Sequence, residues 1–162
     1  MTAARTAGAL LAVCVAVLLQ ATVISRLPLP GGTPSLVLLL VIAIGFSAGT
    51  TAGLFAGFVA GATVDLMSDH PLGVAAICLA LGGFVAGTLL DNGTRGVARS
   101  LLLVVTIAGV VQLLYAALLA LLGARGGSVL HGLAGAVGYD ALLAPLVLPV
   151  VAAVERRLRS VR

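Results

Sequence analysis

The feature that most constrains this chain is a charge-free run of thirty residues from Ser35 to Val64. A single helix of that length would be about 45 Å long, whereas the hydrocarbon core of a bilayer is about 30 Å thick. We therefore expect two short spans, 35–48 and 50–66. The break is expected within Gly45–Gly53, where glycine, serine and threonine are the poorest helix formers of the run. One strongly tilted helix is the alternative.

The composition extends this expectation to the whole chain. Hydrophobic residues make up 61% of the 162 residues and charged residues 9%, and the mean hydropathy is +1.26. Soluble domains are about a quarter charged, and disordered chains have low hydrophobicity, so both classes are excluded. At roughly 20 residues a span, the chain has room for five or six helices and none for a soluble catalytic domain. The sequence predicts an all-α polytopic membrane helix bundle in a single domain, 1–162.

Four further apolar runs complete the predicted bundle, at 7–25, 72–90, 101–122 and 130–154. The first run could instead be a cleaved signal peptide, because Arg5 precedes it. It is longer than a usual signal core and more spans follow it, so we favour a retained span. A basic tail follows at 155–162.

The distribution of arginines favours six spans with both termini in the cytoplasm, since basic residues concentrate on that side. Six spans place seven arginines inside, namely Arg5, Arg95, Arg99, Arg156, Arg157, Arg159 and Arg162. Two remain outside, Arg26 and Arg125. A five-span chain with its N-terminus outside reaches the same ratio. A single helix over 35–64 would exceed the bilayer by about 15 Å, which favours six spans.

Glycines recur every four residues within the charge-free run and form a glycine ladder: Gly45, Gly49, Gly53, Gly57 and Gly61. Asp65 follows the last of them at the same spacing. Small residues at this spacing let membrane helices approach closely. The stripe drifts by about 40° per step, so a straight neighbouring helix could follow only two or three of the glycines. The ladder predicts packing inside this bundle or contact with the helix of another protein. Gly83 and Gly87 form a shorter example.

Asp140 lies about ten residues inside the last apolar run. A carboxylate there costs several kcal/mol unless it is paired, hydrated or protonated. Its available polar partners include Gln20, Gln112, Tyr115, Tyr139 and His131. A hydrogen bond between helices is the favoured role, and a proton or substrate site or a contact with a partner protein are the alternatives.

The polar turn after the ladder contains Asp65, Ser68, Asp69 and His70. Its spacing matches no metal-binding motif, so we expect Asp65 to end one helix and Ser68 or Asp69 to cap the next. No nucleophile, phosphate-binding loop or paired-carboxylate pattern occurs elsewhere. The sequence predicts a protein without enzymatic activity, cofactor or metal. The tail residues Arg156, Arg157, Arg159 and Arg162 predict contact with the lipid surface rather than with nucleic acid.

The block Gly53–Gly73 resembles the signature of the rod shape-determining protein MreD family, GxxxGFxxGxxxDL followed shortly by PLG. The matching residues are Gly53, Gly57, Phe58, Gly61, Asp65, Leu66, Pro71, Leu72 and Gly73. The likeness extends to the segment after Pro34, although the family commonly has Asp where this chain has Ser35. After Gly87 it is compositional.

The resemblance implies a scaffold subunit of the bacterial cell-elongation complex in the plasma membrane. Its implied partners are MreC, a bitopic protein with one membrane helix, and, directly or through MreC, MreB filaments and the wall synthases RodA and its transpeptidase. It also implies a fold similar to that of the substrate-binding subunits of vitamin-uptake transporters. Such a subunit is the alternative function, and the scarcity of aromatic residues, four Phe, two Tyr and no Trp, counts against it. A channel built around Asp140 is a third hypothesis.

The six-span arrangement predicts that reporters fused after Met1 and after Arg162 both report the cytoplasm, because an even number of crossings returns the chain to the same side. Activity of paired periplasmic and cytoplasmic reporters at each terminus measures this. Termini on opposite sides would contradict six spans.

Overall fold

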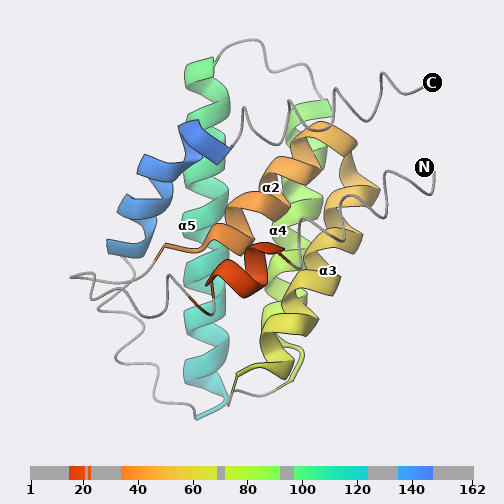
Figure 1. Cartoon of the computed structure of the whole chain (residues 1–162), viewed down its shortest axis with the longest axis vertical. Coiled ribbons are helices and arrows are strands. Elements are labelled where there is room, and N and C mark those ends of the chain that lie inside the picture. Colours follow the sequence, from red (N-terminus) through yellow and green to blue (C-terminus); the bar gives the residue numbers. More distant parts are fainter. Residues whose placement is uncertain are drawn as a thin grey trace.

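The computed structural model describes residues 15–20, 22, 34–68, 72–91, 97–123 and 135–147, and the regular structure in these ranges is helical (Figure 1). Four helices carry most of it: α2 (Leu36–Ala48), α3 (Thr50–Leu66), α4 (Val74–Asp91) and α5 (Val97–Leu121). A short segment at 15–20 and the helix Gly135–Val147 bring the described helices to six. The predicted all-α class is therefore confirmed.

One described helix, Arg99–Leu121 within α5, is long and apolar enough to cross a bilayer. The helices Leu36–Ala48, Thr50–Leu66, Val74–Leu89 and Gly135–Val147 are apolar but shorter. The bounds of the six spans and the side of each terminus therefore stay predictions. The arginines of the tail, together with Asp69, His70, Pro71 and His131, lie outside the described residues.

The charge-free run is divided at Gly49 into two helices. Gly49 has φ 93° and ψ 176°, a backbone conformation that is essentially restricted to glycine. A Cβ built on Gly53 would lie 2.8 Å from the Cα of Gly45. These two positions would be about 12 Å apart in a straight helix. The chain thus reverses direction at Gly49, and α3 returns beside α2.

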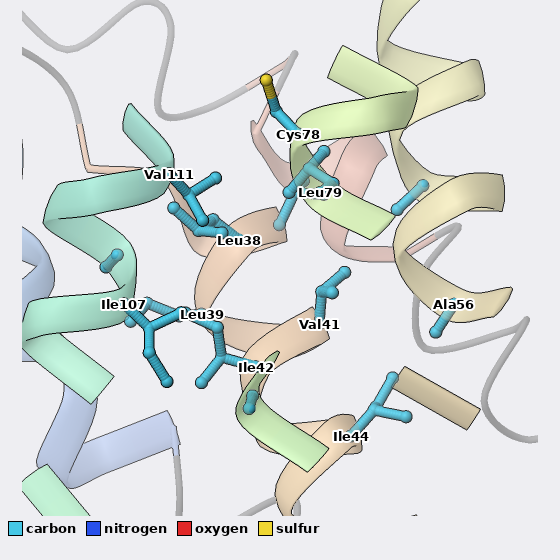
Figure 2. Packing of buried hydrophobic residues seen from close by; sticks show 14 of the residues in the cluster. Leu38, Leu39, Val41, Ile42, Ile44, Ala56, Cys78, Leu79, Ile107 and Val111 are labelled. Carbon is cyan, nitrogen blue, oxygen red and sulfur yellow. The ribbon is translucent and has the colours of Figure 1, made fainter. Parts of the chain in front are cut away.

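Helix α2 forms the centre of the bundle and contacts α3, α4 and α5. Eight of its thirteen residues are buried, as expected for a helix that is hydrophobic all round. Figure 2 shows Leu38, Leu39 and Ile42 of α2 lying close to Ile107 and Val111 of α5. The core therefore sits between α2 and α5 on one side and between α2 and the α3–α4 pair on the other.

Large apolar side chains cover the outside of the described bundle. They occur on α3, α4, α5 and the helix Gly135–Val147, and include Phe55, Ile77, Leu102, Val110 and Leu142. Soluble monomers rarely expose such extensive apolar patches. The surface fits a lipid environment or contact with other membrane helices.

Candidate functional site: a glycine-packed helix pair and two buried carboxylates

The glycines of α3 bring its backbone directly against the backbone of α4. A Cβ added at Gly53 would lie 2.8 Å from the carbonyl carbon of Gly83. At Gly57 it would lie 2.6 Å from that of Leu79, and at Gly61 2.5 Å from that of Ala75. Such distances are shorter than side-chain carbons adopt, so no larger residue fits without separating the helices.

Helix α4 contributes glycines to the same contact. A Cβ on Gly83 would lie 2.6 Å from the carbonyl carbon of Gly53, and one on Gly87 2.5 Å from the Thr50 nitrogen. Gly45 of α2 packs at the same point, because a Cβ added to it would lie 2.5 Å from the Gly83 carbonyl oxygen. Three helices therefore converge at Gly83.

The glycine ladder is thus divided between two helices. Gly45 belongs to α2, Gly49 forms the reversal with nothing within 4 Å of its Cβ position, and the remaining three glycines line α3. Because the chain reverses at Gly49, only the three glycines of α3 have to stay in contact with α4. The gradual rotation of a five-glycine stripe around one long helix therefore does not arise.

Asp65 ends this packing surface and caps the N-terminus of α4. Its side chain is 2% exposed. One carboxylate oxygen, Oδ2, accepts hydrogen bonds from the backbone N–H groups of Gly73 at 2.9 Å and Ala76 at 3.1 Å. The other, Oδ1, accepts one from Ala75 at 3.1 Å. A carboxylate here satisfies N–H groups that have no partner within the helix and interacts favourably with its dipole.

The expectation that Ser68 would cap the next helix is wrong. Its hydroxyl donates to the carbonyl of Val64, one turn back in α3, at 2.7 Å. The cap comes instead from Asp65, three residues earlier, because the turn brings the start of α4 back over the end of α3. Gly73, with φ 99°, lies in this turn, while Leu66 and Leu72 are exposed beside it.

Asp140 forms a second buried junction, at the start of α2. Its side chain is 0% exposed. The Ser35 backbone N–H donates to Asp140 Oδ1 at 2.7 Å, and the Gln112 side-chain amide donates to Oδ2. Asp140 therefore links the start of α2, the middle of α5 and the helix Gly135–Val147.

Gln20 completes the same junction from the N-terminal segment. Its amide Nε2 donates to the Pro34 carbonyl at 2.9 Å, and its Oε1 accepts the Val37 N–H at 3.4 Å. The sequence offered Gln20 and Gln112 among the possible partners of Asp140; Gln112 bonds to it directly, whereas Gln20 bonds to the backbone of Pro34 and Val37 beside it. The sequence missed the backbone of Pro34 and Ser35. The signal available was the change from the Pro-rich loop to the apolar run, which marks a helix start with unpaired N–H groups.

An apolar helical bundle with close-packed glycines and lipid-compatible outer faces defines a helical membrane protein. A model of the family described as rod shape-determining protein MreD matches residues 5–154, and the chain belongs to this family. It is thus a membrane protein of the bacterial rod-shape system, in a shape-determining, non-catalytic family. Neither the curated proteins nor the solved structures contain a match. Similarity to vitamin-transporter subunits stays a prediction.

The packing geometry predicts that Gly57→Ala destabilises the protein by about 1–3 kcal/mol or more, because the added methyl group overpacks two backbones. Gly109→Ala is the matched control, since its Cβ would meet Val137 at an ordinary 3.8 Å. The control should be neutral or stabilising, as alanine favours helix. Thermal unfolding of the purified proteins in detergent measures both. Equal melting temperatures would contradict direct backbone contact.

The two carboxylates should respond differently to amidation. Asp65→Asn should cost about 1–3 kcal/mol, because both oxygens accept from backbone N–H groups that cannot rotate away. Asp140→Asn should cost less than about 1 kcal/mol, because the Gln112 amide can turn and accept from the new amide group while Ser35 keeps its acceptor. The same melting experiment compares them. A larger loss for Asp140→Asn would indicate that its charge is required.

Proposed function

We propose that this chain is a non-enzymatic scaffold subunit of the bacterial cell-elongation complex that binds MreC and so helps to position and regulate peptidoglycan synthesis. Membership of the MreD family supports the rod-shape role. MreC is proposed as the direct partner, with MreB, RodA and its transpeptidase reached directly or through MreC. The proposed location is the cytoplasmic membrane, with several spans and both termini inside.

The observation that carries this proposal is that α3 has two different faces, a buried one with small residues and an exposed one with large apolar residues. Its small residues are buried against the bundle: Ala52, Gly53, Ala56, Gly57, Ala60 and Gly61. Its large residues face away, with Phe55 62% and Phe58 54% exposed beside Leu54. We call Leu54, Phe55 and Phe58 the α3 outer face. These residues share one side of the helix because their spacing follows its 3.6-residue period.

The α3 outer face suits a transmembrane helix as its partner. Membrane helices associate through close packing rather than through the hydrophobic effect. Two neighbouring phenyl rings offer a rigid surface for such packing, with little side-chain entropy to lose. Phe58 is also part of the family motif, and more than half of its surface is exposed. A partner anchored by one membrane helix, as the family resemblance implies for MreC, would pack along this face.

The buried side of α3 explains how a small protein could hold such a partner in a fixed orientation. Backbone contact at Gly53, Gly57 and Gly61 sets the position of α3 on α4, and the Asp65 cap fixes its end. The outer face then moves only with the whole bundle. Chemical groups that would act on a substrate are not needed for this role.

The test purifies the tagged protein from native membranes in mild detergent. It compares the amount of MreC that is recovered with each variant and with the unmodified protein. Phe55→Ala combined with Phe58→Ala should lower recovery by about tenfold or more, because buried aromatic anchors contribute most to such contacts. Leu102→Ala combined with Val110→Ala, on the exposed side of α5, is the matched control. Melting temperatures of both variants should stay near that of the unmodified protein. Undiminished MreC recovery, or recovery of transporter ATPase subunits with the unmodified protein, would contradict the proposal.

A further inference from the structure

A cavity of about 160 Å³ lies where the ends of several elements meet. Its walls come from the N-terminal segment, the start of α2, the end of α3, the first half of α4 and the second half of α5. It is separate from the α3 outer face, and neither the scaffold function nor the family assigns it a role.

The floor of the cavity is apolar and buried. Leu38 of α2, Cys78 and Leu79 of α4 and Val111 of α5 line it, and each is at most 8% exposed. Figure 2 shows Leu38, Leu79 and Val111 pointing toward one another, with Cys78 at the edge of the group. Water gains few hydrogen bonds on such a floor, and apolar cavities of this size stay dry or take apolar molecules.

The rim of the cavity is polar and half-buried. Gln20, Ser35, Gln112 and Tyr115 line it. The two amides are engaged in the Asp140 junction through the hydrogen bonds described above. The hydroxyl groups of Ser35 and Tyr115 have no hydrogen-bond partner within the part of the chain that the structure describes. A hydroxyl group can both donate and accept a hydrogen bond, so the rim offers two hydroxyls for a bound molecule above an apolar floor.

We propose that this cavity binds a small amphipathic molecule whose apolar body lies on the floor and whose hydroxyl or carbonyl group bonds to Tyr115 and Ser35. The volume suits a body of about six to ten heavy atoms, since an engineered cavity of about 150 Å³ accepts benzene. A highly charged molecule would make no favourable contact with the apolar floor. A pure hydrocarbon would leave the hydroxyl groups of the rim without a hydrogen-bond partner.

The position of the cavity gives the bound molecule access to both buried carboxylate junctions. Val64 and Ala75 in its wall adjoin Asp65, and Ala75 donates to that carboxylate. Ser35 and Gln112 donate to Asp140. A ligand would therefore bridge the α3–α4 pair and the α2–α5 half of the bundle, and would stabilise their relative position.

The test uses the full chain in lipid nanodiscs, with 4-fluorophenol as the probe and fluorine NMR as the readout. Empty nanodiscs give the signal of probe dissolved in lipid. We expect an additional protein-bound resonance with the unmodified chain. Val111→Phe fills the cavity and should abolish that resonance. The neighbouring Val110→Phe, on the 60% exposed outer side of α5, should retain it.

Tyr115→Phe keeps the shape of the wall and removes one hydroxyl group. It should weaken probe affinity by about three- to tenfold, the effect of losing one hydrogen bond. The proposal is overturned if the unmodified protein gives no bound resonance, if Val111→Phe retains it, or if Tyr115→Phe binds the probe as tightly as the unmodified chain. Because Tyr115→Phe leaves the packing unaltered, it tests the proposal even if Val111→Phe does not fold.

Discussion

Direct contact between the backbones of α3 and α4 sets the geometry on which the other features of this protein depend. Because Gly53, Gly57 and Gly61 have no side chains, the two helices approach until the backbone of each meets that of the other. That approach leaves no room for large side chains between them. The phenylalanines of α3 therefore lie on the opposite side, where they are available to lipid or to a partner helix.

The second organising constraint is the need to satisfy backbone N–H groups that the bundle buries away from water. A buried N–H group without a partner costs about 1–3 kcal/mol. Two helix starts, those of α2 and α4, meet this need with buried carboxylates from other helices. Asp65 caps α4 from the end of α3, and Asp140 caps α2 from the helix Gly135–Val147. The two acidic side chains thus have the same structural role at different helix starts, and this role explains their burial without a proton pathway.

Much of this architecture was predictable from local sequence signals. The glycine spacing predicted a close helix contact, and the length of the charge-free run predicted a break, which occurs at Gly49. The cap by Asp65 was harder to predict from the sequence, because its oxygens accept from N–H groups that are eight to eleven residues away across a turn. The Asp140 junction joins residues 105 positions apart. Spacing along a chain carries no information on such contacts, so the sequence could offer Gln112 among several possible partners of Asp140 but could not select it or find the Ser35 backbone.

The cavity was also beyond sequence reasoning, since its floor consists of ordinary core residues. Leu38, Leu79 and Val111 are of the same residue types as their buried neighbours and differ from them in lining an unfilled space. Tyr115 was considered only as a partner for Asp140. Its side chain instead lines the space beside Gln112.

The assignment of α3 as the partner-binding helix is tested most directly by placing a photo-crosslinking amino acid on this helix in living cells. Position 58 should give an adduct with MreC, because Phe58 lies on the exposed side of a helix whose other side is occupied by α4. The same amino acid at Val110, similarly exposed on α5, should give no MreC adduct above background. An MreC adduct from Val110 and none from position 58 would contradict the assignment.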